Sequence, residues 1–112
     1  MKKRAIKKPW GFEEELVLNS KCSVKVLNVR AGGMTSLQKH KKRSEFWRVI
    51  SPCRVWIGRR KIRAGVGQEF LIKAGQVHRL EGLSKKGSVL EISFGKFEDK
   101  DIVRVEDDYG RN

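Results

Sequence analysis

Apolar and polar residues alternate in short runs along this chain. We expect strands over residues 22–29, 45–50, 53–58, 68–72, 77–80, 88–94 and 101–105, which are rich in valine, isoleucine, phenylalanine and tryptophan. None of these runs is long enough for an amphipathic helix, and glycines recur between them. Short strands separated by glycine turns predict an all-β sandwich or barrel. Residues 57–65, IGRRKIRAG, predict an exposed hairpin with solvated charges.

The alternation also predicts which side chains share a face, because neighbouring residues of a strand point to opposite sides. Gln38 and His40 are expected on one face, and Glu45 follows after a short turn at residues 41–44. One hairpin would then present these three side chains to a single small volume. His78 joins them if its strand lies in the facing sheet.

The length of 112 residues indicates a single domain that spans the whole chain, 1–112. We expect a basic N-terminal arm over residues 1–12, with Trp10 of the PWG turn packed on the barrel, and a C-terminal edge or capping segment over residues 98–112. No apolar run is long enough to span a membrane, and no apolar region follows the basic start as in a secretion signal. A cytoplasmic protein is therefore expected, with Cys22 and Cys53 as buried thiols rather than a disulfide.

The formal net charge of +13 concentrates in residues 2–8, 39–43 and 59–63. Such a charge could attract nucleic acid, an anionic membrane or a phosphorylated small molecule. Acidic residues are scarce between residues 16 and 97, where the only ones are Glu45, Glu69, Glu81 and Glu91. Glu45 is therefore notable, because it lies close to one of only two histidines.

Two ordered sets of residues are similar to the two motifs of the cupin barrel family. Gly32, Gln38, His40 and Glu45 follow the first motif, and Gly67, Gly75 and His78 follow the second. The sequence departs from the motifs at three positions: Pro52 replaces a glycine, Lys73 a proline and Gly82 an asparagine. The resemblance implies a double-stranded β-helix, that is, a jelly-roll barrel.

Within the cupins, the chain most resembles the C-terminal domain of type II mannose-6-phosphate isomerases. The resemblance covers nearly the whole sequence and is most specific in SLQKHKKRSEFW and DIVRVEDDYGR. In many of those proteins the domain is fused to a mannose-1-phosphate guanylyltransferase, whose nucleotide-binding loop this sequence lacks. We therefore expect an aldose–ketose isomerase without nucleotidyl transfer.

By this resemblance Gln38, His40, Glu45 and His78 are metal ligands. Two imidazoles, a carboxylate and an amide oxygen suit one divalent ion of Zn, Co, Mn, Ni or Fe. In the alternative interpretation the histidines are ordinary half-buried residues, Glu45 pairs with a neighbouring cation, and no metal binds.

Isomerisation of mannose 6-phosphate to fructose 6-phosphate needs a base that carries a proton between two carbons through an enediol. Glu91 is the candidate for this catalytic base, because Val89, Glu91 and Ser93 share the inward face of their strand. Burial would raise its pKa towards a useful range. Glu91 could instead orient a ligand histidine or pair with an arginine.

A sugar phosphate also needs cations that bind its phosphate. Arg43 lies inside the ligand motif and is a candidate for both catalysis and substrate binding, whereas Lys73 and Arg111 are candidates for substrate binding. The competing interpretation of each is a solvated surface cation.

Two other functions compete with the isomerase. A cupin without catalytic activity could bind a sugar or sugar phosphate through the same metal, since a fold does not determine a function. Nucleic-acid binding is disfavoured because the aromatic residues follow the strand pattern rather than the basic runs. The exposed edge strands expected of a small barrel favour a homodimer.

Overall fold

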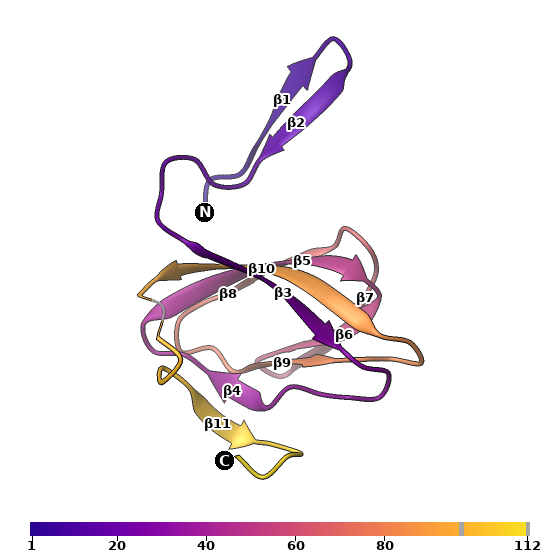
Figure 1. Cartoon of the computed structure of the whole chain (residues 1–112), viewed down its shortest axis with the longest axis vertical. Coiled ribbons are helices and arrows are strands. Elements are labelled where there is room, and N and C mark those ends of the chain that lie inside the picture. The colour runs from indigo at the N-terminus through magenta and orange to yellow at the C-terminus, as the bar shows by residue number, and fades with distance from the viewer. Residues whose placement is uncertain (97, 112) are drawn as a thin grey trace.

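The computed structural model describes residues 1–96 and 98–111, and every regular element in these ranges is a β-strand. Two antiparallel sheets face each other, and a separate hairpin projects from one side (Figure 1). The all-β prediction is confirmed. Each expected run corresponds to one strand, and the ends of that strand differ from the predicted ends by at most two residues. Asn112, the last residue of the expected capping segment, lies outside the described residues.

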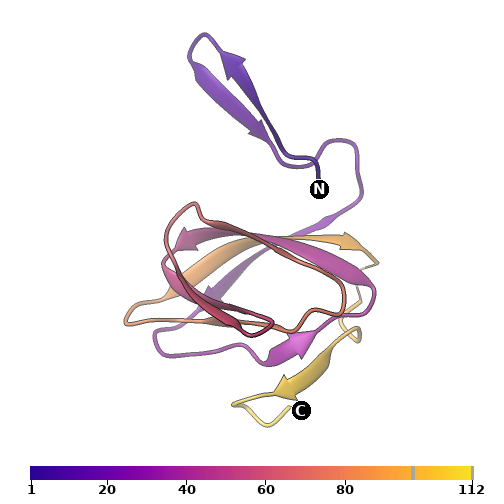
Figure 2. The same cartoon turned by 180° about the vertical axis from the view of Figure 1, so that it is seen from behind.

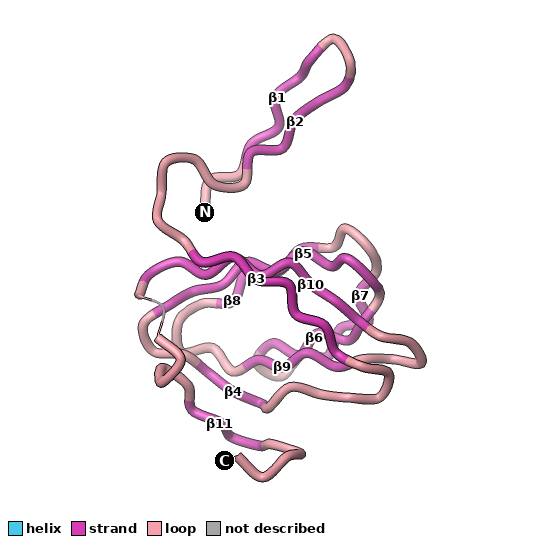
Figure 3. The backbone as a smooth tube through the Cα atoms, viewed as in Figure 1, coloured by secondary structure: helices cyan, strands magenta, loops and turns pink. Residues whose placement is uncertain are grey.

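The first sheet has four strands in the order β3 (Ser23–Val29), β10 (Gly87–Gly95), β5 (Arg43–Ser51) and β8 (Glu69–Ile72). The second has five, in the order β11 (Val103–Glu106), β4 (Leu37–Lys39), β9 (His78–Glu81), β6 (Cys53–Ile57) and β7 (Arg60–Ala64). The strands β6 and β7 form the expected hairpin, which turns at Gly58 and exposes Arg59, Arg60 and Arg63. Loops join β2 to β3 and β3 to β4 (Figure 3).

The core lies between the inner faces of the two sheets. Trp47 and Val49 of β5 and Val89 of β10 are buried against Val55 of β6 and Leu80 of β9. These residues alternate with outward-facing ones, as the sequence pattern requires of a sheet with one buried face. The same alternation brings polar residues of β5 and β10 to the interior.

The chain crosses from one sheet to the other at Pro52, between β5 and β6. A proline is compatible with this corner, because its missing N–H interrupts no ladder hydrogen bond there. The departure from the motif glycine at Pro52 therefore leaves both flanking strands intact.

A hairpin of β1 (Arg4–Lys8) and β2 (Gly11–Glu15) extends away from the four-stranded sheet (Figure 2). Ion pairs hold its base, where Arg48 of β5 binds Glu14 at 2.7 Å and Lys3 binds Glu69. The expectation that Trp10 packs on the barrel is wrong. The pairing of Lys8 with Gly11 places Trp10 in the terminal turn, where 71% of its surface is exposed.

The two cysteines differ in environment. Both are free thiols, and Cys53 is buried in the core as expected, whereas Cys22 is exposed just before β3. The prediction of a buried Cys22 is therefore wrong. In the described part of the chain, no helix is long and apolar enough to cross a membrane.

Candidate metal centre

Two opposing sheets supply the predicted ligands. Gln38 lies on β4 and His78 on β9, and these residues are paired Cα partners in the five-stranded sheet; His40 directly follows β4. Glu45 lies on β5 in the facing four-stranded sheet. The expected hairpin of Gln38, His40 and Glu45 is therefore wrong, because the chain changes sheets between β4 and β5.

The side chains of His40, Glu45 and His78 nevertheless converge in the interior. Glu45 Oε1 lies 3.3 Å from His78 Nε2 and 3.8 Å from His40 Nε2. All three residues are buried, and one potential ligand atom from each lies within 4.8 Å of the others. Donors about 2.0–2.2 Å from a shared ion lie roughly 3–3.5 Å apart when they are neighbours in its coordination shell. The observed separations are close to this spacing.

Backbone carbonyls fix the orientation of both imidazole rings. His40 Nδ1 donates to the Asp101 carbonyl at 2.5 Å, and His78 Nδ1 donates to the Gln76 carbonyl at 3.0 Å. A ring that donates from Nδ1 keeps its lone pair on Nε2 when it is neutral. Both Nε2 atoms are thus directed towards Glu45 as potential ligand atoms.

Several buried polar atoms of Glu45 and His78 have no hydrogen-bond partner within the described part of the protein. Both carboxylate oxygens of Glu45 and Nε2 of His78 are buried without a hydrogen-bond partner among the described residues. Leaving such atoms unpaired in a protein interior is unfavourable. A divalent cation would satisfy all three at once, so the residues present fit a metal ion.

Burial and neighbouring charges favour the protonation states that bind metal. Burial lowers the pKa of His40, which keeps its imidazole neutral. Burial alone would raise the pKa of Glu45, but His78, His40 and Arg43 outweigh it and lower that pKa. A neutral imidazole beside an ionised carboxylate is the state that coordinates a metal.

Gln38 and Arg43 border this group. The Gln38 side-chain oxygen accepts a hydrogen bond of 2.8 Å from Ser36 Oγ and keeps a second lone pair, because a carbonyl oxygen has two. Arg43 Nη2 lies 3.2 Å from His40 Nε2, and its Nη1 donates to the Glu98 carbonyl. Arg43 therefore competes with an ion for the lone pair of His40.

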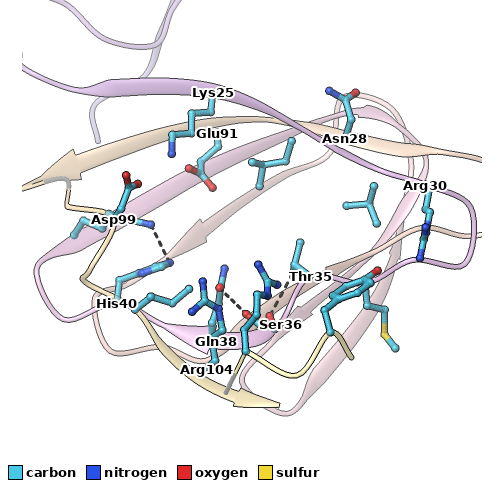
Figure 4. A pocket seen from close by; sticks show the side chains of 17 residues that line it. Lys25, Asn28, Arg30, Thr35, Ser36, Gln38, His40, Glu91, Asp99 and Arg104 are labelled. Atoms are coloured by element: carbon cyan, nitrogen blue, oxygen red, sulfur yellow. Dashed lines mark hydrogen bonds between the residues drawn. The ribbon is translucent and has the colours of Figure 1, made fainter. Parts of the chain in front are cut away.

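A cavity of about 760 Å³ opens beside His40, whereas Glu45 and His78 are not among its described lining residues. Gln38, His40, Arg43 and Glu91 all line it, and Figure 4 shows His40 and Glu91 projecting from opposite walls. Its volume lies in the range of small-molecule sites. A ligand in this cavity would contact residues of both sheets.

Glu91 is held rigidly at the cavity wall. Only 5% of its surface is exposed, and its two oxygens accept hydrogen bonds from Trp47 Nε1 at 3.2 Å and Ser93 Oγ at 3.3 Å. Burial and the negative charge of Glu45 raise the pKa of Glu91, against the opposing effects of Arg43 and Trp47. Such a carboxylate is a stronger base than an exposed glutamate.

The two other phosphate candidates differ in position. Arg111 lines the cavity, but Asp107 binds its guanidinium through two contacts of 2.9 Å, and this pairing lowers the pKa of Asp107 to about 2. Lys73 is exposed in the loop between β8 and β9 and is not among the cavity-lining residues. The structure therefore does not bring Lys73 together with the other predicted site residues.

Sequence reasoning did not identify three further cations that line the cavity, Lys25, Arg30 and Arg104. The signal for Arg104 was present in its strand pattern. Val103 and Val105 of β11 are exposed, while Arg104 between them is half-buried. A cation on the inward face of an edge strand indicates a polar interior at that point.

Comparisons with known proteins show the family of the chain. Residues 1–107 match the family model described as Mannose-6-phosphate isomerase C-terminal. Xanthan biosynthesis protein XanB from Xanthomonas campestris pv. campestris is 33% identical over 111 residues, which cover 96% of this chain and 24% of that protein. Mannose-1-phosphate guanylyltransferase ManC from Salmonella typhimurium is 32% identical over 111 residues, or 96% and 23% of the two chains.

A solved structure supports the fold. An uncharacterized conserved protein with a double-stranded β-helix domain from Klebsiella pneumoniae superimposes with a TM-score of 0.67 at 17% identity, over 81% of this chain and 80% of that one. The fold is a double-stranded β-helix. The chain spans about a quarter of the length of the curated relatives described above.

Proposed function

The chain belongs to the mannose-6-phosphate isomerase C-terminal family, and from this membership we propose that it is a metal-dependent isomerase of sugar phosphates. Mannose 6-phosphate and fructose 6-phosphate are the proposed substrate and product. The observation that carries the proposal is the set of buried, unpartnered ligand atoms of Glu45 and His78 next to His40, which lines the same cavity as Glu91.

Gln38, His40, Glu45 and His78 would hold the ion. When bound, a divalent metal polarises a carbonyl and stabilises negative charge on oxygen. The imidazoles bind in their neutral form, and the Asp101 and Gln76 carbonyls keep them oriented. Glu45 supplies the one negative charge of the group.

Glu91 transfers the proton between carbons. In its ionised form it takes the proton from C2 of open-chain mannose 6-phosphate and returns it to C1. The hydroxyl proton of O2 is lost and O1 gains one, so that the aldehyde becomes a ketone without an oxidant or reductant. Trp47 Nε1 and Ser93 Oγ keep the carboxylate directed at the substrate throughout.

Arg43 assists from the border between the ligands and the cavity. Its positive charge opposes the rise in the pKa of Glu91 and contributes to the lowered pKa of Glu45, so it favours the ionised form of both carboxylates. Its contact with the Glu98 carbonyl fixes the guanidinium in this position.

Metal content is the first test. Protein without a histidine tag is loaded with Zn, Co or Mn, freed of excess ion, and measured by plasma mass spectrometry. We expect about one ion per chain for the wild type and for Glu13→Gln, whose site is exposed in β2, and almost none for a Glu45→Ala, His78→Ala double variant. Each loaded protein then enters a coupled isomerase assay. Folded, metal-loaded wild type without turnover of any hexose or pentose phosphate would overturn the proposal.

A second function is favoured by the contact of Arg43 with the lone pair of His40. If Arg43 occupies this lone pair and the ion is held by the remaining ligands, the domain binds a sugar or sugar phosphate through the metal without catalysis. Tight binding of mannose 6-phosphate without conversion selects this function. The homodimer expected from the sequence stays a prediction.

A further inference from the structure

The C-terminal segment lies against the loop that carries His40. The strand β11 pairs with β4 at the edge of the five-stranded sheet, and residues 98–102 lead the chain to it (Figure 1). Residues 40–42, here called the ligand loop, join β4 to β5 and so connect the two sheets. Asp101 contacts all three residues of this loop.

The carboxylate of Asp101 binds the backbone of the ligand loop. Its Oδ1 accepts a hydrogen bond from the Lys41 N–H at 2.8 Å, and its Oδ2 accepts one from the Lys42 N–H at 2.9 Å. Hydrogen bonds to an ionised acceptor are roughly twice as strong as those between neutral groups. The carboxylate therefore fixes Asp101 relative to the loop.

The carbonyl of the same residue binds the side chain of His40. It accepts a hydrogen bond of 2.5 Å from Nδ1 of the ring. The main chain of His40 is held separately, because its carbonyl accepts a hydrogen bond of 2.7 Å from the Gly75 N–H. Displacement of Asp101 would therefore release the imidazole ring while the backbone of His40 stays in place.

A second acceptor holds the segment at the same point. The Glu98 carbonyl accepts hydrogen bonds from the Asp101 N–H at 3.0 Å and from Arg43 Nη1 at 3.3 Å. The Glu98 carboxylate also pairs with Lys42 at 3.2 Å, but both side chains of this pair are exposed, and such pairs contribute little. The carboxylate of Asp101, which is half-buried, is the stronger side-chain link between the segment and the loop.

The acceptor at Nδ1 decides which nitrogen of a neutral His40 can bind a metal. With the proton on Nδ1, the lone pair lies on Nε2, which is 3.8 Å from Glu45 Oε1. Without this acceptor the ring could carry its proton on Nε2 instead, and that nitrogen would then have no lone pair for an ion. Partners of this kind commonly change metal affinity by about tenfold to a hundredfold.

We propose that Asp101 is a positioning residue of the metal centre. Its carboxylate binds the ligand loop, and its carbonyl thereby fixes the Nδ1–H tautomer and the direction of His40 Nε2. The same segment supplies Asp99, Ile102 and Arg104 to the cavity lining, so its seating orients a ligand and forms a cavity wall in one step. This inference rests on the proposed function for its effect on activity, but not for its effect on the tautomer.

The first test is the tautomer of His40 in metal-free protein, measured from the ring nitrogen signals in a long-range ¹H–¹⁵N NMR spectrum. We expect the wild type to carry the proton on Nδ1 and Asp101→Ala to show a mixture of the two tautomers. Asp101→Asn should fall between, because its amide oxygen can still accept one of the two backbone N–H bonds. His78, whose Nδ1 donates to the Gln76 carbonyl, is the internal control and should be unchanged in every variant.

The second test is zinc affinity, measured by competition with a chromogenic chelator. We expect Asp101→Ala to bind zinc about tenfold to a hundredfold more weakly than the wild type. Asp108→Asn is the matched control, because it removes an exposed acid from the same C-terminal segment, and it should bind zinc like the wild type.

The wild-type spectrum decides the question even if Asp101→Ala does not fold, because a His40 without a proton on Nδ1 would overturn the proposal. An unmoved tautomer in folded Asp101→Ala, an equal change at His78, or zinc affinity equal to that of Asp108→Asn would also overturn it. If His40 and zinc affinity respond as expected but the wild type converts no sugar phosphate, the positioning role stands and the isomerase is removed. If the wild type is active and His40 does not respond, the isomerase stands and the positioning role is removed.

Discussion

Replacement of Gly82 by alanine tests how tightly the loop that carries Arg30 is held. A Cβ atom at residue 82 would lie 2.2 Å from the Arg30 carbonyl oxygen and 3.2 Å from that of Val29, whereas ordinary contact begins at 3.4 Å. The obstacle is backbone rather than the end of a flexible side chain. The loop must therefore retreat by about 1 Å, a forced shift of the kind that accompanies overpacking.

The cost follows from two contributions. Overpacking of this kind costs about 1–3 kcal/mol. Retreat of the loop also weakens the hydrogen bonds between Gly82 and Gly33 and between Gly32 and Leu83, each worth about 1 kcal/mol. We expect a loss of about 2–4 kcal/mol in the free energy of unfolding. For a domain of this size that corresponds to a fall in Tm of roughly 8–16 °C.

Urea and thermal unfolding of Gly82→Ala measure this loss. Gly65→Ala is the matched control, because no atom lies within 4 Å of its added Cβ and its backbone is not left-handed, so it should be unchanged or slightly stabilised. Equal unfolding free energies for the two variants would refute this reasoning.

Two further predictions follow from buried side chains. A thiol reagent at about pH 8 should label Cys22 in the native protein and Cys53 only after unfolding. The reason is that burial raises the pKa of Cys53 to about 11, so that its reactive thiolate is scarce at this pH. Two labels on the native protein in a mass spectrum would contradict this prediction. The isomerase rate should fall as the pH decreases through a pKa above that of an ordinary glutamate, because burial and Glu45 raise the pKa of Glu91 and only its ionised form accepts a proton. Trp47→Phe should move this acid limb to higher pH, since it removes a donor that stabilises the ionised carboxylate, and an unmoved limb would show that the hydrogen bond does not act on Glu91.

The alternation of side chains predicted the strands and the inward faces of Glu45 and Glu91, because that pattern is local. It could not predict which strands pair. Residues 37–39 and 43–51 follow each other so closely that a hairpin was the natural expectation, yet β4 and β5 belong to different sheets. Sheet membership depends on pairings between residues distant in the sequence, such as that of Gln38 with His78.

Other differences between the prediction and the structure arise in segments where charged residues interrupt the alternation of apolar and polar side chains. The sequence predicts a basic arm over residues 1–12 because of its cluster of lysines and arginine, but backbone pairing of β1 with β2 needs no apolar face. Lys73 was proposed from its place in a motif, and the structure leaves it exposed outside the cavity lining. The sequence analysis does not single out Arg104, although its chain neighbours on β11, Val103 and Val105, are exposed.

The division of the proposed metal ligands between two sheets has a consequence for the order of events in folding. His40 and His78 come together when β4 and β9 pair, but Glu45 reaches them only when the opposite sheet docks on top. Contacts between such distant parts of a chain form slowly. A newly made chain therefore has no complete site until the barrel has closed, and ion uptake would mark the last stage of maturation. The time between synthesis and first activity would then depend on closure of the barrel as well as on the supply of metal.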